Sequence, residues 1–327
     1  MPRNKPTLKP AARPAPPLSA ASAFEQAWSK ARPPQGTPAE PPPTVSARWV
    51  LMAGSIAVVG AGLCAWLTLC LLFWQGSWQL LYHPASAIAR TPASVGVAFE
   101  PVAFATTEPG EPRLKGWWIP AASNATYSRF TVLYLHGQTG NLSDTVDALA
   151  ALHTLGVNVL AFDYRAYGQS QFAHPSEASL RQDADWALAY LTGTRHLSAG
   201  SIIVDGEALG ANLALEVAAA HPELAGVVLE SPLHSPADAI FRDPRAHLVP
   251  ARLLVSDRYD ADKAAAALRI PSLWLATPPA PHAMASSANP AGFDRVGGSK
   301  MLVWVALNAQ PERSDAFRRW LDELPGR

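Results

Sequence analysis

The residues VDGEALGANLAL (204–215) combine the end of a strand, a tight turn and the start of a helix. A β-branched run ending at Val204 predicts a buried strand, and the alanine- and leucine-rich residues that follow predict a helix. Gly206 and Gly210 flank the turn in a G-x-x-x-G spacing. A turn of this kind presents its middle residue at the edge of a sheet, and here that residue is Ala208. The sequence thus displays a position at which catalytic turns carry a nucleophile, but alanine has no reactive group.

Around this stretch, short β-rich runs alternate with helical patterns over residues 95–325. From the third run onward the order is strand, helix, strand, which predicts a mainly parallel sheet with helices on both faces. The first two runs have no helix between them and predict an antiparallel edge. The eight expected strands are residues 97–104, 114–119, 130–135, 157–162, 201–205, 226–230, 272–275 and 301–305, and helices are expected at 143–155 and 314–324.

Four further motifs follow the expected strands. They are LYLHGQTGN (133–141), FDYRAYGQS (162–170), PSE (175–177) and LESP (229–232). Together with GEALG (206–210), this ordered set resembles the α/β-hydrolases, and in particular membrane-anchored serine hydrolases with a small cap. The resemblance covers roughly residues 80–325 and implies an α/β-hydrolase fold with an eight-stranded sheet.

The resemblance also implies a catalytic triad in the chain order Ser, Asp, His, and all three positions hold other residues. Ala208 stands at the serine position. Ala280 stands near the acid position, in the loop after the seventh strand. Asn308 and Ala309 stand near the histidine position after the last strand, and the last histidine of the chain is His282. We therefore expect no intact catalytic residue at these vestigial positions.

Other side chains near the strand ends offer the alternative of an active serine hydrolase or esterase with an unconventional nucleophile. Glu207 adjoins the turn, but a turn of this kind presents only its middle side chain. The hydroxyls of Ser143, Ser231 and Ser235 lie where serines commonly serve turns and helix caps, so a structural role is the expectation. His282 is expected to be a solvated residue of the loop.

The oxyanion-binding elements, by contrast, match the family pattern. By the resemblance, the amides of Gln138 and Leu209 stand at the two donor positions, and Gly137 keeps its backbone accessible. With Ala208 beside them, such amides are suited to an acyl, carboxylate or ester group. The alternative is that these loops persist because the sheet needs them.

Composition excludes several other classes. The 327 residues carry 26 basic and 26 acidic side chains, so no electrostatic footprint for nucleic acid is present. The two cysteines, Cys64 and Cys70, lie in one apolar run, and the nine histidines form no metal-binding motif. No glycine-rich nucleotide motif occurs. We expect no cofactor and no metal.

The N-terminal part divides into a tail, an apolar run and a linker. Residues 1–47 contain twelve prolines and are expected to be disordered, with a short helical stretch at 22–31 that serves either as part of a tether or as a docking site for a protein partner. Residues 48–75 are expected to span the membrane, because 49–74 carry no charge and end in tryptophans. Residues 76–94 are expected to form a linker to the hydrolase-like domain at 95–325.

A cleaved signal peptide or a buried core helix is the alternative to this membrane anchor, but the run is long for either. Seven basic residues against two acidic ones precede it. The positive-inside rule then predicts a cytoplasmic N-terminus, with the C-terminal domain on the periplasmic side of a bacterial inner membrane. The hypothesis is a catalytically inactive, membrane-anchored pseudo-hydrolase that acts as a ligand-binding or scaffolding module.

Overall fold

The structure is a computed structural model that describes residues 20–31, 36, 44–108, 110–278, 289–306 and 309–324. It divides into two compact units, Met1–Ala61 and Gly62–Arg327. In the first unit, helix α1 (Ala20–Ala31) confirms the helical stretch expected within the tail and begins two residues earlier. Its Phe24 and Trp28 rings stack with centroids 6.1 Å apart and are exposed.

Helix α2 (Ala47–Gly76) runs from the first unit into the second. It contains an 18-residue window of mean hydropathy 2.4, of which 11% is buried. At about 1.5 Å per residue, its 30 residues reach about 45 Å, so the helix is long and apolar enough to cross a bilayer. Its C-terminal turns belong to the second unit, where Cys70 and Phe73 are buried.

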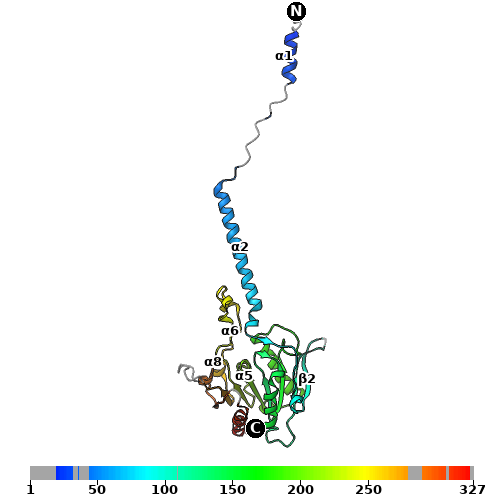
Figure 1. Cartoon of the computed structure of the whole chain (residues 1–327), viewed down its shortest axis with the longest axis vertical. Coiled ribbons are helices and arrows are strands. Elements are labelled where there is room, and N and C mark those ends of the chain that lie inside the picture. The colour runs from blue at the N-terminus through cyan, green and yellow to red at the C-terminus, as the bar shows by residue number, and fades with distance from the viewer. Residues whose placement is uncertain are drawn as a thin grey trace, which may run out of the picture. The chain divides into compact units, whose positions relative to one another are not determined.

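An eight-stranded sheet forms the centre of the second unit (Figure 1), in the order β10-β9-β8-β7-β4-β6-β3-β2. The pairs from β10 to β6 are parallel, whereas β3 is antiparallel to both β6 and β2, which confirms the expected antiparallel edge. The strands are β2 (Glu100–Thr106), β3 (Pro112–Ile119), β4 (Thr131–Leu135), β6 (Asn158–Asp163), β7 (Ile202–Glu207), β8 (Gly226–Glu230), β9 (Ser272–Ala276) and β10 (Lys300–Trp304).

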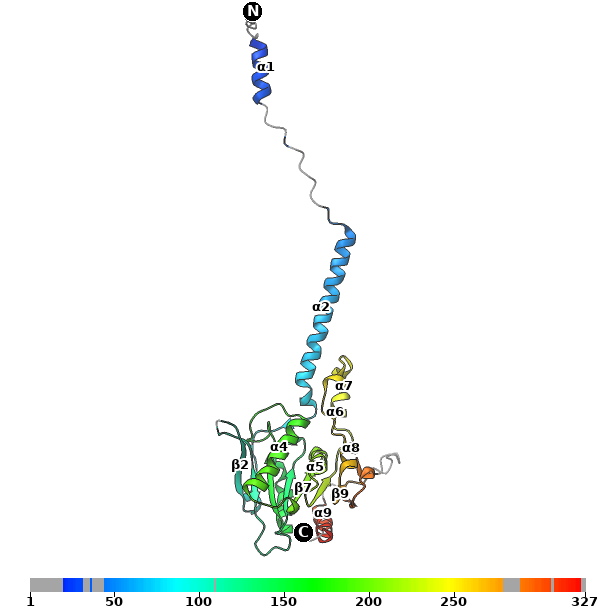
Figure 2. The same cartoon turned by 180° about the vertical axis from the view of Figure 1, so that it is seen from behind.

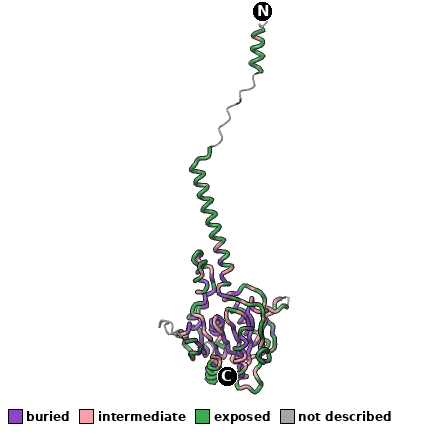
Figure 3. The backbone as a smooth tube through the Cα atoms, in the orientation of Figure 1, coloured by how far each residue is buried: buried purple, intermediate pink, exposed green. Residues whose placement is uncertain are grey.

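Helices cover both faces of this sheet, and two apolar clusters lie between the layers. One face is covered by α4 (Glu177–Ala189), α5 (Leu209–Ala220) and α8 (Ala261–Ala267), and the other by α3 (Val146–Leu155) and α9 (Gln310–Glu323). Figure 2 shows α4 and α5 in front of the strands, and Figure 3 shows burial concentrated in the sheet. Because both faces are covered, the central strands are apolar without alternation, as in Thr131–Leu135, which is buried throughout.

Some elements differ from the sequence-based expectations. Helix α9 begins at Gln310, four residues before the expected start, and α3 begins at Val146 after a short 3₁₀ turn. Within 76–94, expected as a linker, β1 (His83–Pro84) pairs in parallel with β5 (Thr139–Gly140) and Tyr82 is 1% exposed. Two-residue pairings of this kind leave no periodic signal in a sequence.

Candidate functional site

The turn between β7 and α5 has the backbone of a catalytic elbow. Ala208 has φ 52° and ψ −114°, a conformation that L-residues rarely adopt and that costs of order 1–3 kcal/mol. A Cβ on Gly206 would lie 2.1 Å from the carbonyl oxygen of Gly210, and one on Gly210 would lie 2.1 Å from that of Leu135. Both positions therefore require glycine, because the strand, the turn and the helix approach one another at backbone distance.

The loop after β4 faces this turn. A Cβ built on Gly137 would lie 3.6 Å from the Cβ of Ala208, so the two backbones are adjacent. The carbonyl of Gln138 accepts hydrogen bonds from the N–H of His83 at 2.9 Å and from the hydroxyl of Tyr167 at 2.8 Å. These bonds hold the residue that carries the first expected donor, and Nδ1 of His136 lies 2.8 Å from the carbonyl oxygen of Gly137, which shares a peptide with that donor.

Both expected donor groups are unoccupied. Among the described residues, neither the N–H of Gln138 nor that of Leu209 has a hydrogen-bond partner. Leu209 is the first residue of α5, whose opening N–H groups have no partner within the helix. The side-chain Oε1 of Gln138 is buried and also lacks a partner in the described part of the chain. A buried side-chain oxygen without a partner is uncommon in folded proteins.

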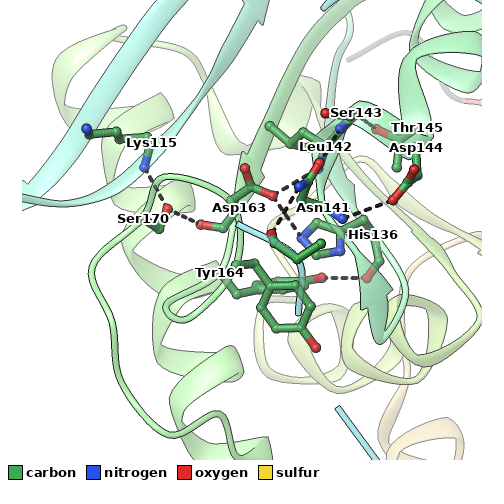
Figure 4. A network of polar contacts seen from close by, with 12 residues as sticks. Lys115, His136, Asn141, Leu142, Ser143, Asp144, Thr145, Asp163, Tyr164 and Ser170 are labelled. Atoms are coloured by element: carbon green, nitrogen blue, oxygen red, sulfur yellow. Dashed lines mark hydrogen bonds and ion pairs between the residues drawn. The ribbon is translucent and has the colours of Figure 1, made fainter. Parts of the chain in front are cut away.

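A polar network supports the loop after β4 (Figure 4). Nε2 of His136 lies 3.6 Å from Oδ1 of Asp163, which accepts a hydrogen bond from the N–H of Leu142 at 2.9 Å. Tyr164 donates to the carbonyl of His136 at 3.0 Å, and their rings lie 4.3 Å apart. Burial lowers the pKa of His136 to about 4 and raises the pKa of Asp163 to about 7. His136 is therefore neutral at pH 7, and both side chains are buried within the fold, where they support the loop.

Two of the side chains that could replace the nucleophile, those of Glu207 and Ser143, have structural hydrogen-bond partners, and the backbone of Ser231 is held at the end of β8. Glu207 accepts a hydrogen bond from Tyr134 at 3.0 Å on the α3 and α9 face of the sheet, away from the turn. The hydroxyl of Ser143 accepts from the N–H of Ala89 at 2.9 Å. Ser231 follows β8 with φ 49°, and its N–H donates to the carbonyl of Leu275 at 2.7 Å.

Two of the expected vestigial triad positions, Ala280 and Asn308, lie outside the described residues, as does His282. Ala309 is described: it immediately precedes α9, and its carbonyl accepts from the N–H of Arg313 at 3.1 Å. Ala309 also packs against the apolar cluster beneath α3 and α9. The vacancy of the acid and histidine positions remains a prediction from the sequence. Within the described ranges, no group of three or more His, Cys, Asp or Glu side chains is arranged to hold a metal ion.

A buried cluster of carboxyl groups on the α3 and α9 face escaped the sequence analysis. Asp205 is fully buried, and neither carboxylate oxygen has a partner in the described part of the chain. Glu230, on the neighbouring strand, accepts from Arg313 at 2.7 Å. Burial raises the pKa of Asp205 well above its usual value and that of Glu230 to about 7. The available signal was an acidic residue inside an apolar strand, at a position that alternation assigns to the core.

Comparisons with known proteins agree with this architecture. The family model described as serine aminopeptidase, S33, matches residues 127–275. The uncharacterized protein MT2364 of Mycobacterium tuberculosis is 32% identical over 223 residues, which are 68% of this chain and 74% of that protein. Protein bem46 of Schizosaccharomyces pombe is 32% identical over 125 residues, or 38% of this chain and 42% of that one.

Solved structures show the same fold at low sequence identity. The esterase Pf2001 of Pyrococcus furiosus has a TM-score of 0.56 and 19% identity, and the match covers 74% of this chain and 99% of the esterase. The acetyl xylan esterase of Paenibacillus sp. R4 has a TM-score of 0.52 and 17% identity, with 78% and 94% covered. The chain therefore belongs to the α/β-hydrolases, in one family with the MT2364 protein, and its residues 127–275 match the S33 serine aminopeptidase model.

Proposed function

We propose that this chain is a catalytically inactive member of its family that binds an acyl, ester or carboxylate group without cleaving it. The observation that carries the proposal is Ala208, which holds the strained backbone of a catalytic elbow and has no nucleophile. Strain of 1–3 kcal/mol is retained in folds mainly where a site uses it. A triad enzyme without its serine loses about 10⁶ in turnover.

The free N–H groups of Gln138 and Leu209 support a binding role. They lie on the two segments that meet at Ala208, where a carbonyl or carboxylate oxygen is the complementary ligand atom. The methyl group of Ala208 leaves the space that a serine hydroxyl would take. The alternative is that the loops only serve the fold. It explains Gly206 and Gly210, but it assigns no role to the N–H groups of Gln138 and Leu209.

The proposal places the domain at a membrane. Helix α2 has the length and hydropathy of a single span, and the charge bias of the residues before it favours a cytoplasmic N-terminus. The hydrolase-like domain would then lie on the periplasmic side of the inner membrane. Fusion of alkaline phosphatase to the C-terminus tests this orientation: an active fusion is expected, and an inactive one with an active cytoplasmic reporter would reverse it.

Catalytic inactivity is tested with the purified full chain, a fluorophosphonate probe and p-nitrophenyl butyrate. We expect no labelling and no turnover above buffer, both in the native chain and in Ala208→Ser, because the base and the acid are absent as well. Labelling that disappears in Ser231→Ala would instead establish a working enzyme with an unconventional nucleophile.

Binding is tested by titrating octanoate into the full chain in calorimetry. Gly137→Ala adds a methyl group 3.6 Å from the Cβ of Ala208, at ordinary contact distance, and narrows the space between the two donors without disturbing the fold. Gly193→Ala is the matched control, because nothing lies within 4 Å of its added methyl group. We expect binding that Gly137→Ala weakens at least about tenfold and Gly193→Ala leaves unchanged. Equal affinities in the two variants would place the ligand elsewhere.

A further inference from the structure

The segment between β8 and α8, residues 233–257, exposes large apolar side chains. This α6–α7 segment contains α6 (Asp238–Phe241), a 3₁₀ turn (Pro244–His247) and α7 (Ala251–Leu254). Leu248 is 60% exposed, and Leu253 is 86% exposed, more than any other large apolar side chain in the described part of the chain. Single exposed leucines are ordinary, and two on one segment beside an apolar helix make that segment a candidate contact surface.

The α6–α7 segment is held in place beside the C-terminal part of α2. At its start, the side chain of Asn212 exchanges two hydrogen bonds, of 2.8 and 2.9 Å, with the backbone of Leu233. At its end, the hydroxyl of Tyr82 donates to Asp257 at 2.6 Å. Figures 1 and 2 both show the segment rising next to the end of α2 that enters the domain. The fold therefore fixes the level along α2 at which the α6–α7 segment lies.

A third contact shows which residue of α2 lies at the level of the segment. The indole N–H of Trp66 donates to the carbonyl of Leu248 at 3.1 Å. Trp66 precedes Trp74, the last residue of the apolar run 49–74, by eight residues, which is about 12 Å along a helix. Leu248 therefore lies level with the apolar part of α2 and not with its end.

A neighbouring face of α2, about a quarter turn around the helix from Trp66, shows that the apolar surface continues below Trp66. Leu63, Leu67, Leu71 and Trp74 recur at helical spacing along one face, and each is more than half exposed. If α2 spans a bilayer, lipid covers this face down to Trp74, because exposure of such a stripe to water is unfavourable. The α6–α7 segment, which contacts α2 at Trp66, then stands at the same depth.

The polar groups of the segment are suited to an interface. Arg242 pairs with Asp238 at 3.3 Å and Arg245 with Asp243 at 2.8 Å, so these charges are compensated. The Trp66–Leu248 hydrogen bond satisfies an indole donor and a carbonyl where water is scarce.

We propose that the α6–α7 segment inserts Leu248 and Leu253 into the membrane–water interface of the bilayer that α2 spans. The partner of this surface is the lipid bilayer itself. The proposal rests on the membrane span included in the proposed function, and it adds a second point of attachment that fixes the tilt of the domain. Amphipathic segments that lie in an interface bury their apolar side chains about 5–10 Å deep, and the level of Leu248, opposite Trp66, lies slightly beyond that range from Trp74.

Depth-dependent fluorescence quenching of the full chain in phospholipid nanodiscs tests the proposal. Cys64 and Cys70 are replaced by alanine, Leu253→Cys is introduced, and the thiol is labelled with bimane. Glu323→Cys, an exposed position on α9, is the matched control. We expect a doxyl-labelled lipid to quench the label at 253, and iodide to quench it at least about threefold less than the label at 323.

Two results at position 253 would overturn the proposal. Full access to iodide without quenching by lipid would leave the segment in water. Shielding from both quenchers would mean that protein, such as a second copy of the chain, covers it. The native Cys64, labelled in a Cys70→Ala chain, reports on α2 separately. If lipid quenches the label at 64 but not at 253, the span stands and the insertion fails; if lipid does not quench the label at 64, the span itself fails.

Discussion

A methyl group on Gly206 would lie 2.1 Å from the carbonyl oxygen of Gly210. The backbones of strand β7 and helix α5 thus lie too close together for a side chain at position 206, with Ala208 between them. This close approach makes the turn sharp. It is present although Ala208, the middle residue of the turn, carries no nucleophile. The geometry of the site is therefore separable from its chemistry, and each can be tested alone.

The first prediction concerns the elbow glycines. In Gly210→Ala the new Cβ would meet the carbonyl oxygens of Leu135 and His136 at 2.1 and 2.5 Å, which no side-chain movement relieves. We expect a loss of about 3 kcal/mol or more in the free energy of unfolding, measured by denaturant titration. Gly193→Ala, with open space around the added methyl group, should change stability by less than about 1 kcal/mol.

Ala208 itself gives the second prediction. Its φ of 52° is unfavourable for alanine and neutral for glycine, so Ala208→Gly should stabilise the fold by about 1 kcal/mol. Ala211→Gly, three residues on in α5 and fully buried, should instead destabilise by about 1 kcal/mol. Thermal unfolding of both variants compares them directly. A loss of stability in Ala208→Gly would show that the backbone is not strained there.

The third prediction uses the opposed titrations of His136 and Asp163. The pKa of His136 falls from 6.5 to about 4, so stability decreases as pH drops through that range, where only the unfolded chain gains the proton. The pKa of Asp163 rises from 3.8 to about 7, so stability decreases as pH rises between those values, where only the folded chain keeps the proton. In the native chain the two slopes oppose each other between about pH 4 and 6.5.

Asp163→Asn removes the pH dependence of stability that Asp163 contributes, and it keeps an acceptor for the N–H of Leu142. Relative to the native chain, the variant should gain up to about 1.4 kcal/mol of stability per pH unit on going from pH 4 to 7. His136→Gln should show the reverse trend, gaining relative stability as pH falls from 6.5 to 4. Urea unfolding at half-unit pH steps measures both, and two flat difference curves would contradict the assignment of neutral forms.

The fourth prediction concerns the buried carboxyl group of Asp205. Burial raises its pKa, so the folded chain keeps a proton that the unfolded chain loses, and the native protein loses stability as pH rises above the ordinary value of 3.8. Asp205→Asn should therefore be more stable than the native chain, by a margin that grows with pH. The exposed Asp262→Asn is the control and should show a small, pH-independent effect. A margin that stays constant between pH 5 and 8 would mean that Asp205 is ionised in the fold.

The sequence by itself determined the sheet and the elbow, because their signals are local. The apolar runs and their alternation with helices predicted all eight strands, and the G-x-x-x-G spacing predicted the turn at Ala208. The uncharged run predicted α2 in the same way. Periodicity and glycine placement are read over a few residues, within the range in which local patterning fixes an element.

Only the tertiary structure decided which side chains meet. His136 and Asp163 end different strands, Asp205 and Arg313 come from β7 and α9, and Trp66 bonds Leu248 across 182 residues. Such contacts depend on the order and register of the strands and on the path of the connecting segments. They form when the whole chain closes around its two apolar clusters, and no local pattern encodes that closure.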